Sequence, residues 1–167
     1  MSNSVLNKNL ASIKKKDPAL FEKIASLKGS KSYATTISKS GFPALIYVDQ
    51  DGSKKQIDSN YDPVGEATRN LARLKIRESI NFIVLGLGLG NQVSEIIKQT
   101  STHAKIYIFE KDPELFALAI REVDLAGIFE HPGVRLFVDT DLREVSGLME
   151  PERENFTLNE YCFVSQK

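Results

Sequence analysis

Three glycines, at positions 86, 88 and 90, end an apolar run that predicts a buried strand at 81–86, and they constrain the fold of this chain more than any other feature. A segment with helical periodicity comes next, at 91–100, and a second apolar run, 105–110, ends in Glu110. This order predicts a βαβ unit in which a glycine turn admits a nucleotide-type ligand and a carboxylate after the next strand accepts its ribose hydroxyls. The pattern therefore indicates a fold class and one place for a ligand, but it does not specify a reaction.

Apolar runs continue to alternate with helical patterns after this unit. Such alternation predicts an α/β fold with a Rossmann-like parallel sheet and right-handed crossovers, of the kind found in methyltransferases. Only about four strands can be counted, fewer than in a complete doubly wound domain, so we expect an incomplete sheet and a fragment of a longer protein. The expected elements are helix 113–124, strand 134–139, helix 141–149 and a last strand at 161–164.

The preceding part of the chain predicts helices and a small antiparallel β-meander. Asp17-Pro18 suits a helix start, because the aspartate can cap the helix and proline is tolerated in the first turn. We expect two domains, with the N-terminal helices and meander in 1–60 and the Rossmann-like α/β domain in 61–167. The expected elements are two short helices or one broken helix in 4–28, strands at 32–38, 44–48 and 54–57, and a helix from Asp62-Pro63 to about Arg77.

Composition excludes several classes of partner. Lysine plus arginine and aspartate plus glutamate both number 22, so the net charge is zero and a nucleic-acid partner is not expected. The sequence has no signal-peptide core and no apolar stretch long enough to cross a membrane, which favours a cytoplasmic protein without a membrane partner. The single cysteine, Cys162, lies in an apolar run and is expected to be a buried strand residue. His103 and His131 have no partner at metal-ligand spacing, so no metal site is expected.

The spacing of the glycines limits the classes of ligand that the turn is expected to bind. A dinucleotide fingerprint would place a further glycine at position 91, which is Asn91 here. The Gly-x-Gly-x-Gly form instead resembles motif I of S-adenosylmethionine-dependent methyltransferases. Those enzymes usually carry an acidic residue two places before the first glycine, where this chain has Val84. The sequence fixes no cofactor, although S-adenosylmethionine or a nucleotide would suit the turn.

Acidic residues follow two of the predicted strands. Glu110 suits the ribose hydroxyls of a nucleoside, although the segment from Glu110 to Pro113 also suits a plain strand-to-helix turn capped by Asp112. Asp139 and Asp141 follow the next strand, where methyltransferase-like folds often contact adenine, and Asp141 also suits a helix cap. No catalytic residues are predicted. The candidate cofactor-binding residues are Gly86, Gly88, Gly90, Glu110 and Asp139.

Several motifs occur in an order that points to a family. They are Asn9-Leu-Ala-Ser-Ile-Lys-Lys-Lys-Asp-Pro-Ala-Leu20, Ser40-Gly-Phe-Pro43, Ser59-Asn-Tyr-Asp-Pro-Val-Gly-Glu-Ala67, Val84-Leu-Gly-Leu-Gly-Leu-Gly90 and Phe109-Glu-Lys-Asp-Pro-Glu-Leu115. Together they resemble the N-terminal part of the motility accessory factor (Maf) family, bacterial proteins that glycosylate flagellin with sialic-acid-like nonulosonic sugars. The resemblance covers most of the chain.

The resemblance implies a Rossmann-like N-terminal domain of a longer glycosyltransferase whose transferase centre lies outside this sequence. It transfers no catalytic residue, so the domain is expected to be non-catalytic on its own, as a scaffold or a nucleotide-type ligand site. The alternative is an S-adenosylmethionine-dependent methyltransferase or a fragment of one. The expected partners are the rest of the parent chain, flagellin, and a second copy paired through an open sheet edge.

Overall fold

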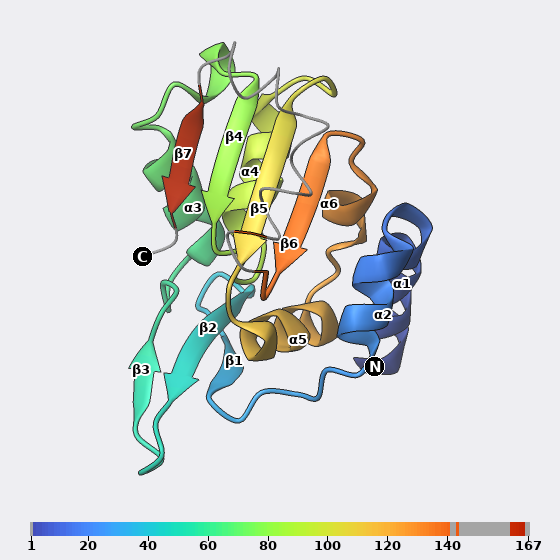
Figure 1. Ribbon diagram of the computed structural model, residues 1–167. Helices are drawn as coiled ribbons and strands as arrows, with labels where there is room; N and C mark the ends of the chain where they lie inside the picture. Colours follow the sequence, from blue (N-terminus) through green and yellow to red (C-terminus); the bar gives the residue numbers. More distant parts are fainter. Residues whose placement is uncertain (1, 141–142, 144–160, 166–167) are drawn as a thin grey trace.

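The computed structural model describes residues 2–140, 143 and 161–165, and its strands form two separate sheets (Figure 1). The strands are β1 (Tyr33–Ile37), β2 (Pro43–Val48), β3 (Lys54–Gln56), β4 (Asn81–Leu85), β5 (Lys105–Glu110), β6 (Val134–Val138) and β7 (Cys162–Ser165). The helices are α1 (Ser2–Lys16), α2 (Pro18–Ala25), α3 (Pro63–Leu71), α4 (Asn91–Gln99), α5 (Pro113–Glu122) and α6 (Ala126–Glu130), with a 3₁₀ turn, η1, at Ile76–Glu78.

The larger sheet is parallel and has the order β6-β5-β4-β7. Its register pairs Val84 with Ile108 on one side and with Val164 on the other. These three side chains are buried, and α4 lies behind β4 and β5 on one face of the sheet (Figure 1). The predicted α/β fold with a parallel sheet is confirmed.

Three helices begin at an aspartate followed by proline, as predicted. The side chain of Asp17 accepts a hydrogen bond from the Leu20 amide at 2.8 Å at the start of α2. Asp62 and Asp112 cap α3 and α5 in the same way. Each cap satisfies an amide that the helix itself leaves unpaired.

The smaller sheet is an antiparallel meander of order β1-β2-β3, which projects from the end of the larger sheet (Figure 1). Its second turn is closed by a hydrogen bond of 2.8 Å from the Asp49 amide to the Ser53 carbonyl. Gly52 has φ 81° there, a backbone conformation that favours glycine. The predicted meander is therefore confirmed.

One buried polar residue joins α1 to the helices of the parallel unit. Asn9 is fully buried, and its amide nitrogen donates to the carbonyls of Ile120 and Val123 at 2.8 and 2.7 Å. Its amide oxygen accepts from the Leu125 amide at 2.9 Å. The first helix is thus attached to α5 and to the segment before α6. The predicted division at residue 60 stays a prediction.

The structure departs from the predicted elements at several points. Helix α3 ends at Leu71 rather than Arg77, because the chain turns into η1 and buries Ile76 there. The sequence did not predict the short helix α6. Cys162 lies in a strand as expected but is only partly buried. The predicted helix 141–149 and Asp141 lie outside the described residues.

No helix in the described part of the chain is long and apolar enough to span a membrane.

Candidate functional site

The glycine turn connects the end of β4 to the start of α4. Gly86, Gly88 and Gly90 have φ values of 88°, 52° and 82°, a region that glycine reaches without steric cost. The Gly86 amide donates to the Phe109 carbonyl at 2.8 Å, and the Gly90 amide donates to the Leu87 carbonyl at 2.9 Å. The backbone of this turn therefore explains the spacing of all three glycines.

Packing adds a second requirement at Gly90. A Cβ atom at this position would lie 2.6 Å from Cδ2 of Leu125 and 3.0 Å from Cδ1 of Ile128. Leu87 and Leu89, which alternate with the glycines, are buried in the core. Leu87 and Leu89 pack the turn into the core. The absence of a side chain at position 90 lets Leu125 and Ile128 of the α6 region approach the start of α4.

Glu110 lies at the end of β5 and is 5% exposed. Its Oε2 accepts hydrogen bonds from the amides of Leu87 and Gly88 at 2.9 and 3.3 Å. Its Oε1 accepts from the Asp112 amide at 3.0 Å. A carboxylate offers about four acceptor positions, so three are used within the chain. The carboxylate binds the glycine turn itself, and its predicted contact with ribose hydroxyls stays a prediction.

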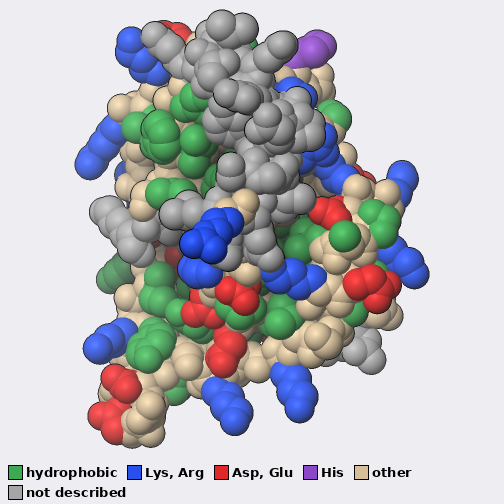
Figure 2. Space-filling view, in the orientation of Figure 1, with side chains coloured by type: hydrophobic (Ala, Val, Ile, Leu, Met, Phe, Trp, Pro, Cys, Tyr) green, Lys and Arg blue, Asp and Glu red, His purple; other side chains and the backbone are tan. Residues whose placement is uncertain are grey.

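Asp139 follows β6 directly and meets Glu110 through the backbone, because its amide donates to the Glu110 carbonyl at 2.9 Å. Its φ is 45°, and its Oδ1 lies 3.4 Å from Nζ of Lys111. The backbone carbonyl of Asp139 accepts a hydrogen bond from Lys23 of α2 at 2.8 Å. The structure thus brings the predicted residues Gly86, Gly88, Gly90, Glu110 and Asp139 to one edge of the sheet, the edge at which its parallel strands end. Figure 2 shows acidic side chains on this face where the strands end and α5 begins.

Tyr33 also lies at this edge, although no sequence motif pointed to it. Its hydroxyl donates to Oδ2 of Asp112 at 2.9 Å, which joins the meander to the start of α5. Burial and this hydrogen bond raise the pKa of Tyr33 to about 12. The phenol therefore stays protonated and acts as a hydrogen-bond donor at neutral pH.

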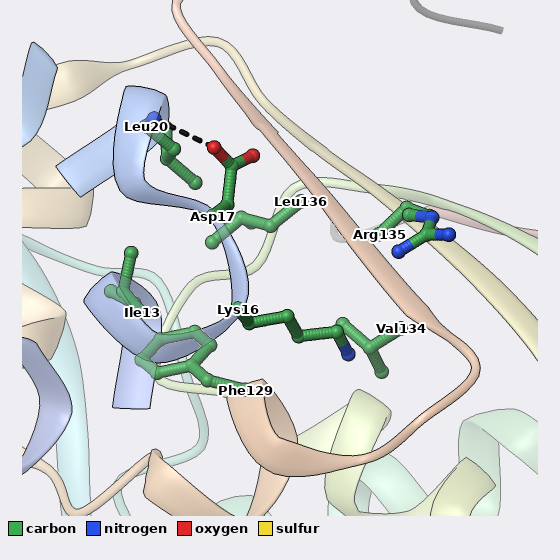
Figure 3. Close-up of a pocket in the computed structure, with 8 residues that line it drawn as sticks. All are labelled: Ile13, Lys16, Asp17, Leu20, Phe129, Val134, Arg135 and Leu136. Carbon is green, nitrogen blue, oxygen red and sulfur yellow. Dashed lines mark hydrogen bonds between the residues drawn. The ribbon is translucent and has the colours of Figure 1, made fainter. Parts of the chain in front are cut away.

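A separate hollow lies between α1, α2, α6 and β6, away from the glycine turn. Figure 3 shows the side chain of Lys16 extending along it beside Phe129 and Val134. Lys16 donates a hydrogen bond to the His131 carbonyl, and burial together with the charge of Arg135 lowers its pKa to about 8. Asp17 in the same wall is engaged as the cap of α2. Lys16 and Asp17 thus each form a hydrogen bond within the chain.

The fold and the site together define a Rossmann-like α/β domain with a glycine turn at the carboxyl end of its first parallel strand. A model of the family described as "Glycosyltransferase Maf N-terminal domain" matches residues 31–135, more than half of the sequence. The chain therefore belongs to the Maf glycosyltransferase family.

A solved structure supports the fold. The structure of the Maf glycosyltransferase from Magnetospirillum magneticum AMB-1 matches with a TM-score of 0.67 at 12% sequence identity. The match covers 99% of this chain and 32% of that one, so this chain spans about a third of its relative's length. At this identity the likeness shows the fold alone. No match was found among curated proteins.

Proposed function

We propose that this chain is a non-catalytic scaffold domain within a Maf protein that glycosylates flagellin in the cytoplasm. The observation that carries the proposal is the environment of Glu110. A carboxylate that served mainly to bind a ribose would present its oxygens to the ligand, whereas this one accepts hydrogen bonds from Leu87, Gly88 and Asp112. In this proposal the glycine turn has been retained because it shapes the fold.

The composition of the site supports the same proposal. Tyr33 donates to Asp112, Lys111 lies against Asp139, and the Asp112 amide donates to Glu110. Among the described residues, none of these three acidic side chains forms a hydrogen bond with a cysteine or a histidine, which are common partners in acid–base and covalent catalysis. Sugar transfer would then occur in the part of the parent protein that this chain does not include. The domain would position that part and present flagellin to it. The outer strands of its sheets, which pair on one side only within the described residues, would be available for self-association.

The alternative function is that of an S-adenosylmethionine-dependent methyltransferase. The left-handed backbone of the three glycines and the adjoining start of α4 favour it, since such a turn lets a ligand approach the main chain. Two features count against it. Val84 is fully buried at the position where those enzymes usually have a carboxylate, and Glu110 is already engaged.

A calorimetric titration separates the two functions. S-adenosylhomocysteine and CMP would be titrated in parallel into the chain. The scaffold proposal expects neither to bind, whereas micromolar binding of S-adenosylhomocysteine would favour the methyltransferase. Asp139→Asn would then test the site, because asparagine tolerates the positive φ while the carboxylate is lost. Asp51→Asn, in the meander turn, is the matched control.

The flagellin part of the proposal needs a cellular measurement. Deleting the gene of the parent protein should lower the mass of purified flagellin by the mass of its attached sugars. Restoring the parent protein should recover that mass. Unchanged flagellin after deletion would exclude this substrate while leaving the scaffold role of the domain to the titration.

A further inference from the structure

The hollow between α1, α2, α6 and β6 surrounds a lysine side chain with apolar groups (Figure 3). Its cavity volume is about 60 Å³. One water molecule occupies roughly 30 Å³ in the liquid, so the hollow admits a molecule of only a few heavy atoms. The apolar residues that line it are Ile13, Leu20, Phe129, Val134 and Leu136.

Lys16 belongs to the last turn of α1, and its side chain extends along this hollow. Its amine donates a hydrogen bond to the backbone carbonyl of His131, which fixes the position of the nitrogen. Among the described residues, no carboxylate forms an ion pair with Lys16. A partly buried amine without an anionic partner loses hydration that stabilises its charged form. The neutral and nucleophilic form is therefore more accessible at Lys16 than at an exposed lysine.

The groups around this amine carry mainly positive charge. Burial and the charge of Arg135, on β6, lower the pKa of Lys16 to about 8. Burial and the charge of Lys16 in turn lower the pKa of His131, so its imidazole is neutral where Lys16 titrates. Asp17 lines the same hollow, and its Oδ1 is engaged as the cap of α2. A reaction that turned the amine into an anion would replace repulsion from Arg135 by attraction.

We propose that Lys16 reacts reversibly with carbon dioxide in this hollow to form a carbamate, which the guanidinium of Arg135 stabilises. The nitrogen lone pair attacks the carbon atom of carbon dioxide and forms a C–N bond. One C=O electron pair moves to oxygen, and the nitrogen releases one proton to water. The product, –NH–COO⁻, keeps one N–H group, which can still donate to the His131 carbonyl. Its carboxylate supplies the negative charge that Arg135 attracts.

Carbon dioxide suits this hollow better than other reagents that acylate amines. It is triatomic, uncharged and apolar, as are most of the lining side chains. An acyl phosphate or a thioester carries a leaving group that is too large for a cavity of this volume. The reaction would make the charge between α1 and β6 depend on the concentration of dissolved carbon dioxide. This inference does not depend on the proposed scaffold function.

The test is chemical trapping on the native chain at about pH 8, where half of the Lys16 amine is neutral. The chain is equilibrated with isotope-labelled bicarbonate and treated with triethyloxonium ion, which converts a carbamate into a stable ethyl ester. Tandem mass spectrometry then locates the label. About one exposed lysine in three hundred is neutral at this pH, so Lys16 should carry at least about tenfold more label than Lys15. Equal labelling of the two lysines, or labelling of neither, would overturn the proposal.

Matched variants separate the reacting group from its partner. Lys16→Arg keeps a positive charge in the hollow but should remove the label at this position, whereas Lys15→Arg should leave the label on Lys16 unchanged. Arg135→Gln should reduce the label on Lys16 about threefold or more, because the carbamate loses an opposite charge and the amine regains its proton. The negative end of α1 would then oppose the product without compensation. Arg135→Lys keeps the charge and should retain the label. Equal labelling of Lys16 in Arg135→Gln and the native chain would contradict the proposal.

Discussion

The amide of Leu87 and the carboxylate of Glu110 form a hydrogen bond of 2.9 Å between residues 23 positions apart. It joins the glycine turn after β4 to the end of the neighbouring strand β5. The same carboxylate also accepts the amides of Gly88 and Asp112, so it connects the turn to the start of α5. A residue type expected at a ligand site is thus an integral part of the fold.

Glu110→Gln should destabilise the chain by about 2–3 kcal/mol. Hydrogen bonds to a charged group contribute roughly 1.5–3 kcal/mol each, and the new amide group would face backbone donors. Urea unfolding measures the loss. Glu122→Gln, at the exposed end of α5, is the control and should change the free energy of unfolding by less than about 0.5 kcal/mol. Equal effects of the two substitutions would show that Glu110 does not stabilise the turn.

Gly90→Ala should cost more than a glycine substitution at a turn that has open space around it. It combines a left-handed backbone, about 1–2 kcal/mol for a non-glycine residue, with a Cβ contact of 2.6 Å to Leu125. We expect a total of about 3 kcal/mol, since overpacking typically adds 1–3 kcal/mol. Thermal or urea unfolding would measure this loss.

Two control glycines separate these causes. Gly52→Ala has a similar φ of 81° but open space around the new Cβ, so it should show the backbone cost alone. Gly127→Ala lies in α6 with nothing within 4 Å and should stabilise that helix slightly. A Gly90→Ala loss no larger than that of Gly52→Ala would show that Leu125 and Ile128 adjust without cost.

Asn9→Ala should release α1 from the parallel unit. The substitution leaves the carbonyls of Ile120 and Val123 and the amide of Leu125 without their partner. A buried group left unpaired costs about 1–3 kcal/mol, so we expect a loss of at least about 3 kcal/mol. Hydrogen exchange should become faster across α1 before the rest of the chain opens. The exposed Asn7→Ala on the same helix should behave like the native chain.

The sequence predicted those parts of the fold that depend on neighbours along the chain. Asp17, Asp62 and Asp112 cap the helices that they precede, because a cap needs only amides two or three residues away. The glycine turn followed from the same kind of local pattern.

Long-range contacts were not predictable from such patterns. Asn9 looks like an ordinary polar residue of a helix until its partners, 111 or more positions away, are known. The end of α3 was misplaced because burial of Ile76 outweighs local helix propensity. The hydrogen bonds of Glu110 likewise depend on how separate elements pack.

The last prediction concerns pH and Lys16. Burial and the charge of Arg135 lower the pKa of Lys16 from 10.5 to about 8 in the folded chain. Between about pH 8 and 10.5 the unfolded chain therefore holds a proton that the folded chain has released, and stability from this group rises with pH. Below pH 8 the amine is charged in both states and this gain is absent. The pKa of Tyr33 is raised from 10 to about 12, so this phenol lowers the free energy of unfolding as the pH rises, but only above its ordinary pKa.

Urea unfolding at pH 7.5 and 9.5, values chosen to lie about this lowered pKa, should show the effect in the native chain. In Lys16→Met the stability gained across this interval should be smaller, because methionine does not titrate. Lys15→Met removes an exposed lysine from the same helix and should retain the native pH dependence. If Lys16→Met and Lys15→Met respond to pH alike, the amine of Lys16 is not desolvated in the hollow that it lines with Phe129 and Val134, and water reaches it there (Figure 3).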